Sequence, residues 1–456
     1  MKELRIKINN GDRYAAETIG RMMEIIGLRM VLDDVKYDIK YGGKSDKKCT
    51  LHIPYRVNDI YWRDLIDGRI DHSDIDESLP FDIVNSFGKI INKEINKREG
   101  KYDVHERLIP ETGIQHKSGI GWIPVLNIYL HFFKNLLIRL FSVKPVVMWP
   151  KGKRACISLS HDVDDPIKYP LKRLMPLPKL RKFGNLTGHL RKSFQQKRTY
   201  SLDPNPDNYW LFDEAMDIEK ERGLRSTFFF ATGNYYSRYG TVYDVKYRIE
   251  DKRFIPVIGR MKDEGFGIGL HASYNSYADR KRIEEEKEKL EKIIGDEIYG
   301  VRHHYWHLSS EPHLTWNYHE RCGFRYDSSI SNNITFGFRN GIGYPYRPFG
   351  GKFELKLIEM PVMVMDQGFH NRELKSGDSF SEFERYLYIL EKTGGFGTMD
   401  WHVKSSFPAN KEFGEWADIY EDVLKNLEKR NDIWFATLEE VTDWWSNRLK
   451  KIHAHE

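Results

Sequence analysis

The sequence predicts an α/β protein in two parts, a small α+β unit followed by a larger parallel α/β unit. After residue 150, short apolar runs alternate with helical segments, which is the pattern of a parallel sheet covered by helices. Residues 1–150 instead mix short alternating runs with helical periodicity. The segment WPKGKR at 149–154 places a proline, a glycine and three basic residues before an apolar run. We therefore expect an N-terminal accessory domain over 1–150 and a second domain over 151–456.

The composition limits the classes of protein that this chain can represent. Its 456 residues include 72 Lys and Arg against 67 Asp and Glu, a net charge of +5, and 40% are hydrophobic. This near balance excludes a dedicated nucleic-acid coat, and the hydrophobic content excludes disorder of the whole chain. Three widely spaced cysteines favour a reducing compartment, and the charged N-terminus lacks a signal peptide's apolar region. We expect a cytoplasmic protein that binds no nucleic acid; the oligomeric state stays open.

In the first unit, two short runs are expected as strands, LRIKI at 4–8 and VKYDIKY at 35–41. The periodicity of AAETIGRMMEIIG predicts a helix between them. A polar stretch at 92–121 is expected to be an exposed excursion. The apolar segment 124–143 predicts a half-buried helix, with an interfacial membrane helix as the alternative, because it is interrupted by His131, Lys134 and Arg139.

The second unit contains six apolar runs of strand length. They are ACISLS at 155–160, STFFFAT at 226–232, FGIGLH at 266–271, LIEMPV at 357–362, FGTMDWH at 396–402 and IWFATL at 433–438. Residues 209–222 and 280–294 are expected helices. Residues 168–198 carry ten Lys and Arg and no Asp or Glu. This basic insertion is either a solvated excursion or a contact with an anion or a membrane surface.

The strongest chemical signal is the acidic cluster SHDVDDP at 160–166, directly after the first of these strands. Its three carboxylates repel one another, so a cation or a catalytic task is the best reason to keep them at a strand end. The alternative is a solvated turn or a helix cap. Because Asp162 and Asp164 flank one residue, they can face the same cavity. One could then bind a metal while the other acts as a base.

Other polar residues follow later strands. His271 and Asn275 are four apart, although an amide oxygen is a poorer zinc ligand than imidazole and a chance pair is the alternative. Three further groups could each be a structural turn. They recur at strand ends, where the active sites of α/β enzymes lie: Arg302-His303-His304-Tyr305, Tyr326-Asp327-Ser328-Ser329 and Asp400-Trp401-His402.

In this order, the segments from about 153 to 445 resemble the motifs of the NodB-homology polysaccharide deacetylases, carbohydrate esterase family 4. The matching segments are SHDVDD, GLRSTFFFATG, RMKDEGFGIGLHASYNSY, VRHHY, RYDSS, MDWH and IWFATLEEVTDWW. The resemblance implies a distorted, partly open (β/α) barrel of NodB type over 151–456. It also implies a divalent metal ion, with zinc as the first choice, and hydrolysis of an N-acetyl group, or secondarily an O-acetyl group, on an amino sugar.

The resemblance also implies roles for individual residues. The catalytic residues would be the base Asp162, the acid His402, Arg302 orienting the base, Asp327 bracing Arg302, and Tyr305 offering its backbone N–H to the oxyanion. The metal ligands would be Asp164 and His271, completed by Asn275 at the usual position of a second histidine, by His304 and then His303 on the following motif, or by no further residue.

Aromatic and basic residues between 337 and 349 suit stacking on sugar rings and binding of anionic groups, with a packed aromatic loop as the alternative. The expected substrate-binding residues are Arg339, Tyr344, Tyr346, Arg347 and Trp401. We expect an enzyme acting on a lipid-linked or nucleotide-linked intermediate of a surface glycan, in peripheral contact with a membrane through the basic insertion. The alternative is a catalytically inactive carbohydrate-binding or scaffold protein of the same fold.

Overall fold

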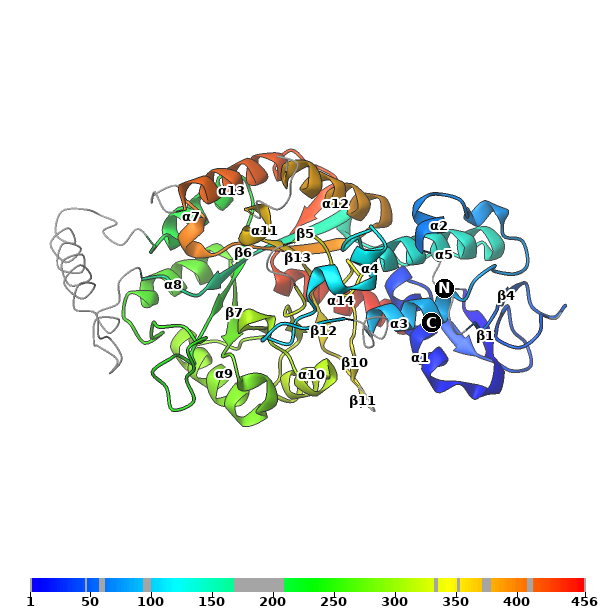
Figure 1. The fold of residues 1–456 in the computed structure, drawn as a ribbon, viewed down its shortest axis with the longest axis horizontal. Coiled ribbons are helices and arrows are strands. Elements are labelled where there is room, and N and C mark those ends of the chain that lie inside the picture. Colours follow the sequence, from blue (N-terminus) through cyan, green and yellow to red (C-terminus); the bar gives the residue numbers. More distant parts are fainter. Residues whose placement is uncertain are drawn as a thin grey trace.

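The structure is a computed structural model that describes residues 2–45, 47–56, 62–92, 100–167, 209–331, 335–350, 353–370, 379–407 and 413–454. The predicted basic insertion at 168–198 lies outside these residues. Figure 1 shows the N-terminal unit at one end of the molecule and the larger unit at the other.

The N-terminal unit is built on a four-stranded sheet. Its strands are β1 (Leu4–Ile8), β2 (Met30–Leu32), β3 (Ile39–Tyr41) and β4 (Leu51–Ile53), in the order β2-β1-β3-β4. All three strand pairs are parallel, and α1 (Arg13–Ile26) connects β1 to β2. Parallel neighbours need crossover connections rather than hairpins. The sheet is therefore parallel, and α1 supplies its helical crossover, while the other helices of the unit follow the last strand in the sequence, as expected of a small α+β unit.

Local sequence explains where α1 begins and ends. The side chain of Asp12 accepts a hydrogen bond from the Ala15 N–H at the first turn. Gly27 ends the helix with φ of 86°, a conformation that favours glycine. The predicted helix is confirmed, with the apolar face packed into the core.

The described residues of the N-terminal unit form four further α-helices, namely α2 (Trp62–Ile66), α3 (Ile83–Ile91), α4 (Ile114–Lys117) and α5 (Val125–Phe141). The predicted half-buried helix is confirmed as α5, which packs against α1, α2 and α3 of its own unit and against α12 of the larger one. Among the described residues, no helix combines the length and the apolar character needed to cross a membrane.

The larger unit is built on a parallel sheet of nine strands. They are β5 (Ala155–Val163), β6 (Ser226–Phe230), β7 (Gly267–Ala272), β8 (Gly300–His303), β9 (Tyr326–Asp327), β12 (Ile358–Glu359), β13 (Val362–Met365), β14 (Phe396–Asp400) and β15 (Ile433–Phe435). The order is β12-β9-β8-β7-β6-β5-β14-β13, and β15 pairs with the first part of β5. All six predicted strands are present, and LIEMPV is divided between β12 and β13.

The division of LIEMPV closes the sheet. Only Met360 and Pro361 separate β12 from β13, so the two edge strands are halves of one bent segment. The Met360 N–H donates to the Asp327 carbonyl (2.8 Å), while the Pro361 carbonyl accepts from the Thr398 N–H (3.0 Å). One end of the sheet thereby meets the other. The predicted distorted, partly open barrel is confirmed.

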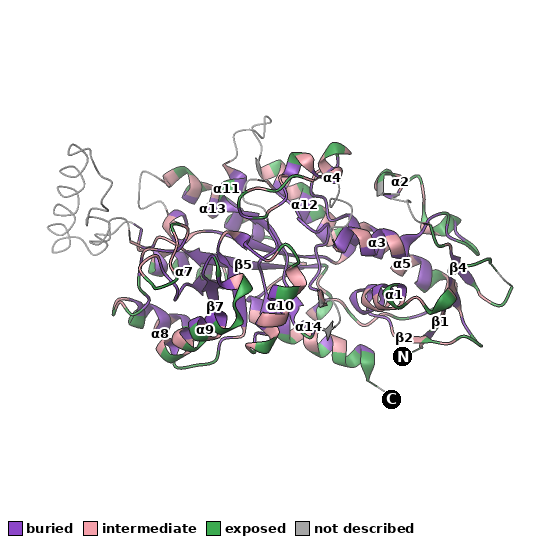
Figure 2. Ribbon diagram, turned by 60° about the horizontal axis from the view of Figure 1, so that its bottom comes forward, coloured by how far each residue is buried: buried purple, intermediate pink, exposed green. Residues whose placement is uncertain are grey.

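Helices cover the outside of this barrel (Figure 1). They are α7 (Phe212–Lys220), α8 (Phe254–Glu264), α9 (Arg280–Ile294), α10 (Pro312–Arg321), α11 (Asp366–Phe369), α12 (Ser379–Thr393), α13 (Gly414–Leu427) and α14 (Leu438–His453). Figure 2 shows the strands of the barrel as buried and the helices as exposed on their outer sides. A small hairpin, β10 (Phe349–Gly350) and β11 (Phe353–Glu354), lies outside the barrel sheet. Strands buried on both faces explain why they appear in the sequence as unbroken apolar runs.

The two units share one hydrophobic core, which runs from Ile19 through Leu130 and Trp149 to Trp445. Arg448 on α14 strengthens this joint, because it donates to the carbonyls of Glu24 (2.8 Å), Ile25 (2.9 Å) and Val147 (3.1 Å). It thereby satisfies carbonyls at the C-terminal end of α1. The boundary near residue 150 stays a prediction.

Candidate active site

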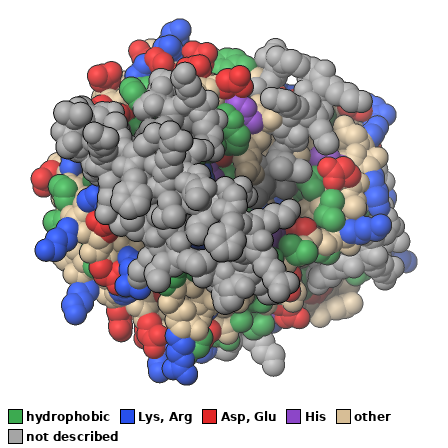
Figure 3. Space-filling model, turned by 60° about the vertical axis from the view of Figure 1, so that its left-hand side comes forward, with side chains coloured by type: hydrophobic (Ala, Val, Ile, Leu, Met, Phe, Trp, Pro, Cys, Tyr) green, Lys and Arg blue, Asp and Glu red, His purple; other side chains and the backbone are tan. Residues whose placement is uncertain are grey.

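The strand ends of the barrel surround a cavity of about 330 Å³. The predicted residues that line it are Asp162, Asp164, His304, Tyr305 and His402. These side chains come from the carboxyl ends of β5, β8 and β14, which the parallel topology brings to the same end of the barrel. Figure 3 views the molecule from the barrel end of Figure 1, where the coloured acidic and basic side chains are interspersed.

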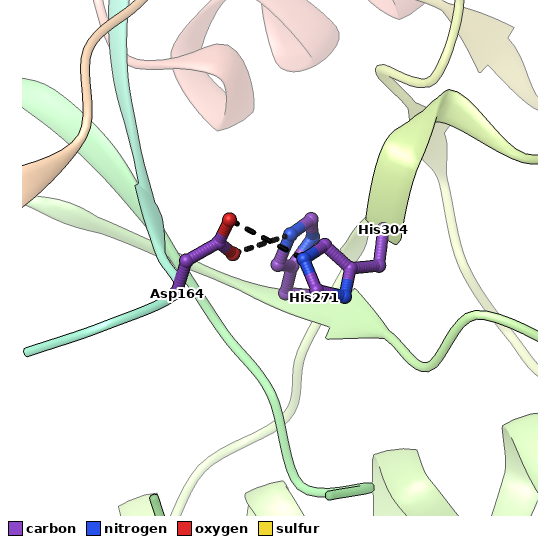
Figure 4. Close-up of side chains that lie close together, drawn as sticks. All are labelled: Asp164, His271 and His304. Carbon is purple, nitrogen blue, oxygen red and sulfur yellow. Dashed lines mark ion pairs between the residues drawn. The ribbon is translucent and has the colours of Figure 1, made fainter. Parts of the chain in front are cut away.

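Two side chains that line this cavity, Asp164 and His304, form with the adjacent, buried His271 a group that could hold a metal ion (Figure 4). The His271 Nε2 lies 3.2 Å from Asp164 Oδ1, and the His304 Nε2 lies 3.3 Å from Asp164 Oδ2. The Nδ1 of His271 lies 3.0 Å from the Arg302 carbonyl, to which it can donate. That hydrogen bond leaves Nε2 of His271 as the nitrogen whose lone pair faces the group.

The residues of this group fit a divalent cation. Within the described part of the chain, the buried atoms Asp164 Oδ1 and His271 Nε2 face each other at 3.2 Å without forming a hydrogen bond, and a cation bound to both would satisfy them. Burial raises the pKa of Asp164, but His304, His271 and His402 outweigh it and hold that pKa well below its usual value. One carboxylate and two imidazoles are a ligand set typical of catalytic zinc, with a fourth position left for water or substrate.

Asn275 differs from the three members of this group. It is exposed, at the start of the short turn Ser276–Ala278, whereas His271 and His304 are buried. His303 is turned elsewhere, with its Nε2 2.8 Å from the Nε2 of His319. Of the candidates for the third ligand, the geometry therefore favours His304 over Asn275 and His303.

Asp162 lies at the end of β5, with only 5% of its surface exposed. Its Oδ1 accepts a hydrogen bond from Arg302 Nη1 (2.9 Å), and its Oδ2 lies 3.8 Å from His271 Nε2. Burial raises the pKa of Asp162, but the charges of Arg302 and His271 outweigh it and lower that pKa. The carboxylate is therefore charged at neutral pH and faces both the cavity and the metal group.

Arg302 is fully buried and is fixed by several partners. Its Nη1 donates to Asp400 Oδ1 (2.7 Å) and to Ser160 Oγ (2.9 Å), and its Nε donates to the Ser328 carbonyl (3.0 Å). Burial and the charge of Asp162 raise the pKa of Asp400 to about 7. Two carboxylates thus share one guanidinium, and Asp162 is held in one orientation.

The prediction that Asp327 braces Arg302 is wrong. Asp327 Oδ2 instead lies 2.7 Å from His319 Nδ1, and its Oδ1 accepts from the Ser329 N–H (2.7 Å). The register of the barrel explains the difference, because it sets Asp400 beside Ser160 on the neighbouring strand. The bracing carboxylate is therefore Asp400.

His402 follows β14 and faces the metal group. Its Nε2 lies 3.3 Å from Asp164 Oδ2, while its Nδ1 donates to Asp366 Oδ2 (2.9 Å). Burial lowers the pKa of His402, but the adjacent charges of Asp366 and Asp164 outweigh it and raise that pKa well above its usual value. The imidazole is therefore held protonated, with Nε2 toward the cavity.

Sequence reasoning missed Asp366, the partner of His402. It lies at the start of α11, directly after β13, and 1% of its surface is exposed. The available signal was its position after the apolar run VMVM, at the same end of the barrel as the other site residues. A single carboxylate of this kind does not stand out in the sequence as the three carboxylates within residues 162–165 do.

Tyr305 lines the cavity beside His304 in an unusual backbone conformation. Its φ is 59°, and φ of the following Trp306 is 54°. Two successive non-glycine residues with positive φ are uncommon and cost free energy, so the surroundings must hold them in place.

The predicted substrate-binding aromatic residues are part of the core. Tyr344 and Tyr346 are buried, and the Tyr346 hydroxyl accepts a hydrogen bond from Asn340 (3.1 Å). Trp401 is buried and stacks on Tyr420 at 4.8 Å. None of the three lines the cavity, so the packed aromatic loop was the better interpretation.

The two predicted substrate-binding arginines also have other partners. Arg347 forms an ion pair with Glu24 of the N-terminal unit. Arg339 is 7% exposed and donates to the Glu106 carbonyl (3.2 Å). Burial and the nearby charge of Arg107 lower the pKa of Arg339 to about 10. Neither lines the cavity, so their predicted role is not supported.

Different aromatic residues, Phe413 and Trp416, line the cavity. Trp416 is half-buried and stacks on His370 at 4.2 Å with 11° between the rings, and Phe413 meets it edge-on at 5.6 Å. Lys404 lines the same wall, 3.3 Å from Asp165 Oδ2. This aromatic wall, Phe413 and Trp416, was not predicted, because Trp416 lies in the amphipathic helix α13 and Phe413 directly precedes it, where aromatic residues are expected to face the core.

Comparison with known proteins gives matches among solved structures alone. No family model matches the chain, and no curated protein matches it. The similar structures include a polysaccharide deacetylase from Mycobacterium smegmatis, with 16% identity, covering 68% of this chain and 95% of that one, at a TM-score of 0.41. Peptidoglycan deacetylase PdaC from Bacillus subtilis matches with 13% identity, covering 66% and 96%, at a TM-score of 0.32.

Two other matches have different descriptions. An allantoinase shares 14% identity over 70% of this chain and 98% of its own, at a TM-score of 0.41. A carbohydrate esterase family 4 pseudoenzyme, in a mutant with restored activity, shares 9% over 65% and 69%, at a TM-score of 0.31. These similarities are too low to transfer an activity, so the function has to be argued from the residues of the site.

Proposed function

We propose that this protein is a metal-dependent deacetylase that hydrolyses the N-acetyl group of an amino sugar. The observation that carries the proposal is the convergence of three groups on one cavity. These groups are the carboxylate of Asp162, the possible metal group Asp164, His271 and His304, and the protonated imidazole of His402. Hydrolysis of an amide needs a base to activate water, a stabilised oxyanion and an acid for the leaving nitrogen, and these groups can supply them.

Asp162 acts as the general base. It is charged at neutral pH, and Arg302 fixes its Oδ1, so Oδ2 is the oxygen available to take a proton from the attacking water. A divalent metal bound by the three ligands supplies Lewis acidity toward the acetyl carbonyl and the water. The backbone N–H of Tyr305 is our candidate for a second donor to the oxyanion.

His402 acts as the general acid. Asp366 holds Nδ1, so the proton on Nε2 is directed toward the cavity and can pass to the leaving nitrogen. The C–N bond of the amide breaks as that nitrogen is protonated, and the products are acetate and a free amino sugar. The aromatic wall of Phe413 and Trp416 suits contact with the apolar face of a sugar ring.

We further propose a substrate that is a lipid-linked or nucleotide-linked intermediate of a surface glycan, met in the cytoplasm. A cavity of about 330 Å³ lies at the lower end of the sizes typical of small-molecule sites, which suits one sugar unit rather than a long segment of polymer. Membrane contact through residues 168–198 stays a prediction, because these residues lie outside the described part of the chain.

Acetate release from N-acetylated amino sugars tests this function. We expect activity in the zinc-loaded wild type and losses of about 10²- to 10⁴-fold in Asp162→Asn and His402→Ala, because each removes a positioned base or acid. Asp263→Asn, an exposed carboxylate on α8, is the control and should keep wild-type activity. Wild-type rates in both site variants would refute the assignment. Zinc binding without any acetate release would favour the alternative, an inactive carbohydrate-binding protein.

A further inference from the structure

A hairpin of the N-terminal unit, residues 101–109, reaches the candidate active site. Tyr102 and Leu108 form an antiparallel bridge, and the Ile109 N–H donates to the Lys101 carbonyl (2.8 Å). Asp103 organises the tip, where its Oδ1 accepts from the backbone N–H groups of His105 (2.8 Å) and Arg107 (3.0 Å). The hairpin is therefore an ordered element with its own hydrogen bonds.

Two side chains of this hairpin contact Tyr305 of the barrel. Arg107 Nη1 donates to the Tyr305 carbonyl (3.4 Å), across 198 positions of sequence. The ring of His105 packs against the ring of Tyr305, with centroids 4.5 Å apart, and its Nδ1 lies 2.8 Å from the Tyr274 hydroxyl. The backbone and the side chain of Tyr305 are thus both held from the N-terminal unit.

The guanidinium of Arg107 is itself fixed before it reaches Tyr305. Its Nε donates to Asp103 Oδ2 (2.8 Å), and its Nη2 lies 2.7 Å from the same oxygen. Because the paired guanidinium has little freedom, its remaining nitrogen is presented to the Tyr305 carbonyl at low entropic cost.

Tyr305 needs such support. It and Trp306 both have positive φ, and His304, the favoured third metal ligand, directly precedes them. A strained segment persists when contacts from several sides fix it. The barrel contacts the ring of Tyr305 through Tyr243 (5.5 Å) and Tyr274 (5.8 Å), and the hairpin adds the hydrogen bond to its backbone carbonyl.

We propose that the hairpin 101–109 is a positioning element of the active site, in which Arg107 and His105 hold Tyr305 and thereby His304. The residues before 150 then have a defined task in the chemistry of the barrel. The effect on turnover rests on the proposed function, but the effect on the backbone at 304–306 does not. His105 is a positioning residue rather than a ligand, because its ring is occupied by Tyr305 and Tyr274.

The experiment compares Arg107→Ala with Arg13→Ala in the full chain. Arg13 is a matched control, because it forms the same kind of Arg–carboxylate pair four residues apart, with Glu17 on α1. Hydrogen exchange of the peptide covering 303–307 is the first measurement. Loss of one hydrogen bond to a charged donor should speed exchange there about 10- to 100-fold in Arg107→Ala and leave it unchanged in Arg13→Ala. Arg107→Lys, which keeps the charge, should restore part of the protection.

Zinc affinity and turnover are the second and third measurements. The dissociation constant for zinc should rise about five- to tenfold in Arg107→Ala, because His304 is less well placed, and kcat should fall while KM changes little. Unchanged exchange at 303–307 in Arg107→Ala would overturn the positioning role. If exchange is faster in Arg107→Ala but the wild type releases no acetate, the positioning role stands and the proposed function is refuted.

Discussion

Replacement of Asp366 by asparagine tests how the proposed acid is kept protonated. Asp366 Oδ2 accepts from the His402 Nδ1–H (2.9 Å), the His402 backbone N–H (3.2 Å) and the Ser405 hydroxyl (2.7 Å). Asparagine has nearly the same shape and removes the charge, so the variant isolates the electrostatic part of this arrangement.

The expected magnitude follows from these contacts. A hydrogen bond to a charged group contributes about 1.5–3 kcal/mol, against about 0.5–1.5 kcal/mol for a neutral one. The range for a charged group corresponds to about a 10- to 100-fold weaker preference for the protonated imidazole in Asp366→Asn. The pKa of His402 should therefore fall, and its acid form should be lost at a lower pH than in the wild type. We expect the alkaline limb of the acetate-release profile to move to lower pH by about one to two pH units, so that the loss relative to the wild type grows as the pH rises.

Steady-state acetate release between pH 5 and pH 9 measures this effect. Ser405→Ala is the matched control, since it removes a neutral donor from the same oxygen and keeps the charge of Asp366, so its loss should stay below about tenfold. The reasoning is refuted if Asp366→Asn keeps the alkaline limb of the wild-type profile. Equal losses in both variants would mean that packing, rather than charge, accounts for the effect.

Three further predictions address the metal group, the aromatic wall and the pH dependence of stability. Calorimetric titration of zinc into metal-stripped protein should show that His271→Ala abolishes binding, whereas Asn275→Ala retains wild-type affinity; the reverse result would restore Asn275 as the ligand. Trp416→Ala should raise KM about two- to tenfold with kcat nearly unchanged, since ring stacking contributes about 0.5–1.5 kcal/mol, and an unchanged KM would remove it from the substrate site. Burial lowers the pKa of His131 on α5 to about 4, so protonation from its ordinary value of 6.5 downward favours the unfolded chain. Between pH 7 and pH 5 the free energy of unfolding should fall by about 2 kcal/mol more in the wild type than in His131→Leu, and equal losses in chemical denaturation would contradict this.

The fold was predictable where burial on both faces leaves an apolar run in the sequence. The strands β5, β6 and β14 are of this kind. The strand β8 was not predicted, because Arg302 and His303 occupy half of it and hydrogen bonds satisfy them inside the barrel. A polar residue that is buried with partners cannot be distinguished from an exposed one by hydropathy.

Site residues that directly follow strands could be predicted from the sequence, but their hydrogen-bond partners could not. The sequence placed Asp162, Arg302 and His402 at one end of the barrel, and the structure brings all three to the cavity region. It could not choose between Asp327 and Asp400 as the partner of Arg302, because that choice depends on strand register.

The residues predicted to bind substrate do not line the cavity, for a related reason. Tyr344 and Tyr346 have the residue type of a sugar platform, but they pack inward. Trp416 stands in the amphipathic helix α13 four residues before the buried Tyr420, and therefore on the same face, so the sequence alone did not show that it lines the cavity rather than the core. Which aromatic ring reaches substrate depends on tertiary packing.

The docking of Arg448 against the end of α1 has a consequence for how the protein is made. The contact joins residues 424 positions apart, and the ribosome adds roughly 5–20 residues per second. The first helix therefore leaves the ribosome several tens of seconds before the side chain that binds its terminal carbonyls has been synthesised. During that interval the apolar face of α1 can already pack against α3 and α5, but the carbonyls at its C-terminal end lack their arginine partner. We expect nascent chains that stop before α14 to be recognised by chaperones and proteases, and the last turns of the final helix to decide whether the first domain is retained.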